Sequence, residues 1–290
     1  MSNRIFYQES GKVNQLGVLI FLLASLFITL VLGYVYELII VFVPFPYLNL
    51  FAAVLVGLVL GMCARIIFRF TNNRNRKSRV ALALVAGLML CYFQWVIYLQ
   101  YLLHDSFPSP MEVMRDGFLD FFHAETLSLL AYLYDNGSWS IFGVQFKGLV
   151  LGITWLIEAG IFLYMPFNAV HKAPLYPYAE ILGKWYPKYT LNNDFDTIAV
   201  NIFIEALDKN PVGAIQELKL GSAFRHTKFH VFYAPEEERQ YLSVEKVWNG
   251  GGGSKESERT MVMANYEINR AAAQAILKSF ENKPEKLDIF

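Results

Sequence analysis

The feature that most constrains this chain is a set of four long apolar stretches in its first half. They cover residues 16–43, 48–69, 80–103 and 141–166. A helix needs about 20 consecutive apolar residues to cross the hydrocarbon core of a bilayer, and each stretch approaches or exceeds that length. The sequence therefore predicts an integral, multi-pass membrane protein with a four-helix transmembrane bundle.

The overall composition averages two different halves. Apolar residues make up 55% of the chain and charged residues 17%, but most of the charge lies after residue 189. The net charge is zero, so bulk charge gives no indication of nucleic-acid binding. Cys63 and Cys91 lie inside predicted spans, where we expect small apolar side chains rather than a disulfide. The first apolar stretch is much longer than the core of a signal peptide, so we expect it to remain as the first span.

Basic residues predict the orientation of the chain. The link between the second and third spans is dense in them: Arg65, Arg69, Arg74, Arg76, Lys77 and Arg79. The link between the third and fourth spans contains only Arg115. Because short cytoplasmic links carry an excess of lysine and arginine, we expect both termini in the cytoplasm and residues 104–140 outside, in a membrane of the bacterial inner-membrane type.

Small residues recur at four-residue spacing in three of the spans. They are Ala53, Gly57 and Gly61 in the second span, Ala83 and Gly87 in the third, and Gly148 and Gly152 in the fourth. Such stripes allow helix backbones to approach closely in lipid. For any single stripe we favour packing within one subunit over a contact between subunits. Three stripes offer more close-packing surface than a four-helix bundle requires, so we also expect a homo-oligomer.

Charged residues at membrane depth form two candidate pairs. Glu37 and Lys147 match in depth near the outer surface, and Glu158 and Arg65 match near the inner surface. A charge at the centre of a span costs about 2.5–3.5 kcal/mol, which a partner would offset. We therefore favour neutralising pairs that fix helix register over the alternative, an ion or proton path. Gln94 is a further polar group expected to face the interior.

The outer segment 109–134 is predicted to be one amphipathic helix, either interfacial or inserted. Its start is a capping box, Ser109-Pro110-Met111-Glu112. Asp116, Asp120 and His123 fall at positions i, i+4 and i+7, a weak candidate site for a divalent metal. A solvated helix face explains the same pattern more simply, so no metal or cofactor is predicted.

The rest of the chain predicts two further parts. Residues 169–191 are rich in Tyr, Trp, Pro and Lys, which suits a collar in the headgroup layer. Residues 192–290 alternate between helical and strand patterns and predict a small cytosolic α+β domain with a three-stranded antiparallel meander. His226 and His230 share one strand face with Lys228, which we expect to be solvated. The run 250–254 is either a natural flexible loop or an engineered linker.

No enzyme motif is present in the sequence. It contains no G-x-S-x-G, H-E-x-x-H, P-loop, G-x-G-x-x-G or Cys-x-x-Cys. We therefore expect a non-enzymatic, oligomeric membrane protein whose cytosolic domain binds a partner protein or signal and couples it to the bundle. The alternative is an ion-conducting pore, or a membrane-perturbing effector, gated by that domain.

Overall fold

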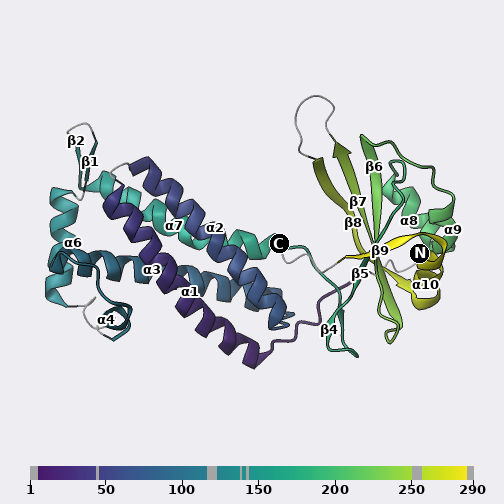
Figure 1. The fold of residues 1–290 in the computed structure, drawn as a ribbon, viewed down its shortest axis with the longest axis horizontal. Helices are drawn as coiled ribbons and strands as arrows, with labels where there is room; N and C mark the ends of the chain where they lie inside the picture. Colours follow the sequence, from purple (N-terminus) through teal and green to yellow (C-terminus); the bar gives the residue numbers. More distant parts are fainter. Residues whose placement is uncertain are drawn as a thin grey trace. The chain divides into compact units, whose positions relative to one another are not determined.

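The computed structural model describes residues 6–43, 46–115, 123–137, 139–141, 144–249 and 257–285. It is mostly helical and divides into two compact units (Figure 1). The helical unit comprises residues 11–173, and the sheet unit comprises residues 1–10 together with 174–289. The described N-terminal segment therefore belongs to the same unit as the second half of the chain: the backbone N–H of Tyr7 donates to the carbonyl of Asn265 at 2.9 Å, and Phe6 forms a β-bridge with Tyr266.

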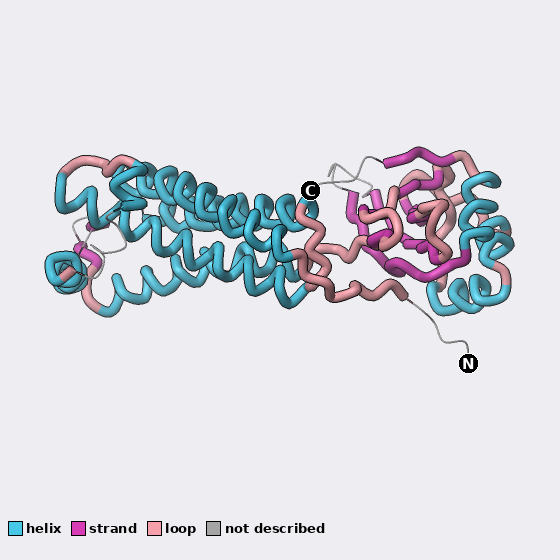
Figure 2. Tube along the Cα trace, turned by 90° about the horizontal axis from the view of Figure 1, so that it is seen from below, coloured by secondary structure: helices cyan, strands magenta, loops and turns pink. Residues whose placement is uncertain are grey.

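Four long helices dominate the helical unit. They are α1 (Gln15–Phe42), α2 (Pro46–Phe70), α3 (Arg76–His104) and α7 (Leu149–His171), and all four are long and apolar enough to cross a membrane. They lie side by side (Figure 2) and bury a common core that includes Phe21, Leu60, Ala83, Leu90 and Phe162. The four predicted spans are thus present as helices.

The fourth long helix differs from its prediction at both ends. It begins at Leu149 rather than at residue 141, because β1 (Trp139–Ile141) and β2 (Val144–Phe146) pair as a short antiparallel hairpin. It ends at His171 rather than at residue 166, with Pro166 inside it. A proline is tolerated in a membrane helix when neighbouring helices pack against the freed backbone. As a result Glu158 lies near the middle of α7 rather than near its end.

The described part of the segment between α3 and α7 contains two shorter helices, α4 (Pro110–Arg115) and α6 (Ala124–Asn136). The predicted capping box is confirmed: the backbone N–H of Ser109 donates to Glu112 Oε2 at 2.6 Å, and that of Glu112 donates to Ser109 Oγ at 3.3 Å. Residues 116–122, in the middle of the predicted outer helix, lie outside the described residues.

The sheet of the second unit has five antiparallel strands, so the prediction of three was wrong. Their order is β8 (Ser257–Asn269), β7 (Arg239–Asn249), β6 (Arg225–Phe232), β5 (Lys188–Leu191) and β9 (Asn282–Glu285). The two missed strands are short. One falls in the aromatic segment predicted to be a collar, and the other contains Pro284, which is tolerated because β9 is an edge strand. The remaining part of that segment forms a hairpin of β3 (Tyr178–Ala179) and β4 (Lys184–Trp185).

Three helices cover one face of this sheet (Figure 1): α8 (Val200–Lys209), α9 (Pro211–Gln216) and α10 (Arg270–Ser279). The predicted caps of the last two are confirmed. Asn210 Oδ1 accepts from the Gly213 N–H at 3.1 Å, and Asn269 Oδ1 accepts from the Ala272 N–H at 2.7 Å.

Two histidines on the second face of the sheet are buried, so the expectation of a solvated histidine face was wrong. His226 and His230 are 4% and 3% exposed. His230 Nδ1 lies 2.7 Å from Thr190 Oγ1, and its Nε2 lies 3.4 Å from Glu245 Oε2. Strand alternation correctly placed the two histidines on one face, but it contains no information about what packs over that face.

Candidate functional site

The structure places the four predicted intramembrane charges differently from the two proposed pairs. Glu37 is buried in α1, at 1% exposure, whereas Lys147 is exposed in the segment between β2 and α7. Glu158 lies on α7 and Arg65 on α2. Among the described residues, Glu37 and Glu158 do not meet these basic partners. The two carboxyl groups instead line one cavity together.

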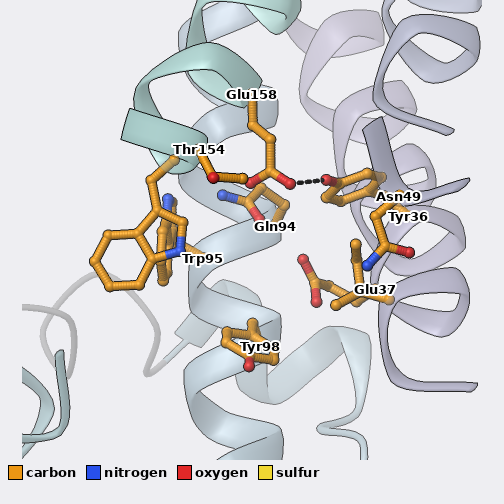
Figure 3. Close-up of a pocket in the computed structure, with 10 residues that line it drawn as sticks. Tyr36, Glu37, Asn49, Gln94, Trp95, Tyr98, Thr154 and Glu158 are labelled. Carbon is orange, nitrogen blue, oxygen red and sulfur yellow. Dashed lines mark hydrogen bonds between the residues drawn. The ribbon is translucent and has the colours of Figure 1, made fainter. Parts of the chain in front are cut away.

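This cavity lies among α1, α2, α3 and α7 and has a volume of about 40 Å³. Figure 3 shows Glu37, Gln94 and Glu158 directed into it from three different helices. Its ten lining residues are Tyr36, Glu37, Ile40, Asn49, Gln94, Trp95, Tyr98, Thr154, Trp155 and Glu158. A single water needs at least about 10–15 Å³, so the space suits a few waters or a small ion.

Glu37 and Asn49 leave oxygen atoms without hydrogen-bond partners in this cavity. In the amide orientation that satisfies both neighbours, Gln94 donates to Glu37 Oε1 at 2.9 Å and accepts from the Trp95 indole N–H at 2.7 Å. Among the described residues, the buried oxygens Glu37 Oε2 and Asn49 Oδ1 have no hydrogen-bond partner. Oxygens of this kind can accept from a donor or coordinate a cation that enters the cavity.

Glu158 is held by an aromatic neighbour. The Tyr36 hydroxyl donates to Glu158 Oε1 at 2.8 Å, and the Tyr36 ring packs edge-on against Phe162 at a centroid distance of 5.1 Å. Trp95 and Trp155 form a second edge-on pair at 5.0 Å. These packed rings fix the cavity wall and position one carboxyl group on it.

The charge balance of the cavity is its main chemical property. Two carboxyl groups line it, and no lysine or arginine is among its ten described lining residues. An ionised carboxylate removed from water is strongly disfavoured unless a positive charge or several donors compensate it. A proton on a carboxyl oxygen or a small bound cation would therefore stabilise this arrangement.

Sequence reasoning singled out Glu37, Glu158 and Gln94 but missed the rest of the site. A signal for the α1 side was present. The buried positions of α1 recur every four residues and include Ser25, Thr29, Gly33 and Glu37. That stripe of small and polar residues, ending at a carboxyl group, marks the face of α1 that packs inward.

The small-residue stripes on α2 and α3 are contacts within one chain. A Cβ atom on Gly57 would lie 2.9 Å from Met165 Cβ, and one on Gly61 would lie 2.7 Å from Ala169 Cβ. A Cβ on Gly87 would lie 2.6 Å from the carbonyl oxygen of Phe162. All three meet α7, and Ala53 and Ala83 are fully buried on the same two helices.

The predicted stripe of the fourth span is not a comparable contact. Gly148 precedes α7 as its N-cap, with a φ of 59° that suits glycine, and an added Cβ would meet nothing within 4 Å. A Cβ on Gly152 would lie 3.3 Å from the ring of Tyr134, a tight contact with a side chain of α6 in the same chain rather than with the backbone of another long helix.

The weak metal candidate falls mostly outside the described residues. Asp116 and Asp120 are not described, and His123 is the exposed N-cap of α6. Within the described part of the chain, no group of three or more His, Cys, Asp or Glu side chains is arranged to hold a metal ion.

Comparisons with protein-family models, with curated proteins and with solved structures gave no match to this chain.

Proposed function

We propose that this is a cation-coupled multi-pass membrane protein whose transmembrane bundle binds a proton or a small monovalent cation between Glu37 and Glu158. The observation that carries the proposal is the pair of unpartnered buried oxygens, Glu37 Oε2 and Asn49 Oδ1, at a cavity with two carboxyl groups and no basic residue. Carboxyl groups neutralised by lysine or arginine would have favoured a purely structural role. Ionisable groups without such partners in a span are typical of ion and proton pathways.

The polar stripe on α1 supports movement of charge as well as binding. Ser25, Thr29 and Glu37 lie on one buried face of the helix, with Gly33 between the last two. Successive members are about 6 Å apart along the helix axis. The Thr29 hydroxyl donates to the Ser25 carbonyl at 2.6 Å, so it adds an oxygen to the interior without requiring a partner from another helix.

In this proposal the positive-inside asymmetry places both termini, and with them the sheet unit, in the cytoplasm of a cell with a bacterial-type inner membrane. The bundle supplies the cation site, and the sheet unit supplies the recognition surface.

The glycines of α2 and α3 give no argument for an oligomer, because α7 of the same chain already packs closely against them.

The test compares binding in three forms of the full-length protein in detergent: wild type, Glu37→Gln and the control Glu125→Gln. Glu125 is an exposed carboxylate at the start of α6, away from the cavity. We expect the unfolding temperature of the wild type and of the control to rise with NaCl relative to choline chloride, or to change equally with pH in both. Glu37→Gln should lose the sodium response, or should respond to pH less than the other two forms do.

The sodium comparison and the pH comparison together identify the ligand. A sodium response at fixed pH indicates a metal cation, and a pH response unaffected by sodium indicates a proton. Reconstitution into vesicles with an imposed gradient then separates binding from conduction. An unchanged response in Glu37→Gln would overturn the proposal, because the site would not be where the ion acts.

A further inference from the structure

A second, larger cavity lies wholly within the sheet unit. Its volume is about 500 Å³, within the range of about 300–1,000 Å³ that is typical of small-molecule sites. Its walls come from the N-terminal segment at residues 7–10, the segment 178–186, the connection between β6 and β7, and the start of α10. Segments far apart in the sequence thus build one pocket.

Tyrosine rings form the base of this pocket. Tyr7 and Tyr186 both pack edge-on against Tyr241, at centroid distances of 5.2 and 5.5 Å. The Tyr186 hydroxyl donates to the Arg239 carbonyl at 2.6 Å, and the Tyr7 hydroxyl accepts from the Tyr178 N–H at 3.3 Å. Tyr241 is only 7% exposed and lines the pocket. Its ring is held in place there by the rings of Tyr7 and Tyr186.

Carboxylates dominate the charged groups around these rings. The pocket is lined by Glu180, Glu236, Glu237 and Glu238, against the two guanidinium groups of Arg239 and Arg270. Both arginine side chains also contact other groups of the sheet unit. Arg239 Nε lies 3.6 Å from Glu267 Oε1, and Arg270 Nη1 donates to the Pro235 carbonyl at 3.0 Å.

Carboxylates also act on two of these tyrosines. Burial raises the pKa of Tyr7 to about 12, and the nearby Glu9 and Glu180 carboxylates add to the increase. Burial also raises the pKa of Tyr241; Glu267 and Glu237 contribute in the same direction, and Arg239 opposes them. Burial disfavours a charge of either sign, whereas the carboxylates disfavour only a negative group.

We propose that this pocket binds a free alkylammonium compound, with its charge among the Glu236–Glu238 carboxylates and its carbon chain against the tyrosine rings. Aromatic faces attract organic cations, and tyrosine adds a hydrogen-bonding tip to an apolar surface. A hard metal ion would require converging oxygen ligands and would gain nothing from three packed rings. The site is separate from the Glu37–Glu158 cavity, and its existence does not depend on that of the bundle site.

The probes are 1,4-diaminobutane and its neutral analogue 1,4-butanediol, titrated calorimetrically into the full-length protein in detergent. We expect saturable binding of the diamine at one site and none of the diol. Magnesium chloride and sodium succinate serve as the metal and anion probes.

Two variants locate the site. The double variant Glu236→Gln/Glu238→Gln changes two exposed side chains, so the fold should be retained, which the unfolding temperature verifies. We expect it to weaken diamine binding by about tenfold or more, since each removed charge lowers the attraction for the cation. Tyr241→Phe keeps the ring and removes its hydroxyl group, and a smaller loss is expected. Glu258→Gln, exposed on β8 outside the pocket, is the matched control and should bind normally.

Several results would overturn the proposal. One is equal diamine affinity in the double variant and in Glu258→Gln, which would place the amine elsewhere. Another is binding of magnesium or succinate in preference to the diamine, or of the diol with equal affinity. Failure of the diamine to bind the wild type at all would have the same consequence.

Discussion

Replacing Gly87 with alanine tests whether α3 and α7 are held in direct backbone contact. The added Cβ would lie 2.6 Å from the carbonyl oxygen of Phe162 and 3.2 Å from the Cα of Leu163. Both are backbone atoms in the interior of α7, so neither can rotate away as the end of a flexible side chain would. The two helices must separate locally to accommodate one methyl group.

Two opposing contributions determine how much Gly87→Ala changes the free energy of unfolding. Alanine is favoured over glycine inside a helix by about 1 kcal/mol. Overpacking a close contact costs about 1–3 kcal/mol. Gly87→Ala should therefore destabilise the protein by up to about 2 kcal/mol, even though its helix propensity improves. Gly160→Ala on α7 is the matched control: an added Cβ there meets nothing within 4 Å, so only the favourable propensity term applies.

Unfolding of the two variants and the wild type in detergent, by heat or by increasing SDS, measures the difference. We expect stability in the order Gly160→Ala, wild type, Gly87→Ala. Equal stability of the two variants would refute the close contact at Gly87. Light scattering on the same samples adds a second readout: if Gly87→Ala keeps its unfolding temperature but dissociates, the contact joins subunits instead.

Four further outcomes are expected. His230 lowers the pKa of Glu245 through a hydrogen bond, so this carboxylate stabilises the fold above its unfolded pKa and the contribution is lost as pH falls through the folded pKa; Glu245→Gln should flatten the acid limb of a stability–pH curve, and an unchanged limb would contradict this. Losses from Glu37→Gln and Lys147→Met should add, because the side chains do not meet, and a coupling above about 0.5 kcal/mol in a double-mutant cycle would contradict this. Cysteine-accessibility labelling should place the C-terminus in the cytoplasm; labelling from outside would reverse the orientation. Shortening residues 250–254 to Asn-Gly should leave the unfolding temperature within a few degrees, and a large loss would show that the run is structural.

Features that depend on local sequence were predictable. The four long helices follow from the length of their apolar stretches, and the caps at Ser109, Asn210 and Asn269 follow from side chains that reach backbone groups three residues away. Hydropathy predicted the start of α7 incorrectly, because the first residues of that apolar stretch form the β1–β2 hairpin instead of helix. An apolar hairpin and an apolar helix start have the same composition, so hydropathy does not separate them.

Features that depend on distant partners were not predictable in the same way. Matching Glu37 to Lys147 by depth assumed that the fourth helix began at residue 141, and the later start at Leu149 removed Lys147 from the helix. Strand β5 has only four residues, and it is a strand because β6 and β9 lie on either side of it. Its aromatic surroundings resembled a membrane interface because tyrosine suits a covered sheet face as well as a headgroup layer.

The joining of residues 6–10 to the sheet unit restricts how the chain can thread a membrane. Tyr7 is bonded to Asn265, and the four long helices lie between these two positions in the sequence. Both ends of the intervening segment must therefore emerge on the same side, so the number of crossings between them is even, whichever side that is. At 13 residues and 1.5 Å per residue, α6 would extend only about 20 Å, short of the roughly 30 Å needed to add a fifth crossing. The same joining sets an order of events during synthesis: the N-terminal segment leaves the ribosome first but can pair with β8 only after the four long helices and β8 have been made.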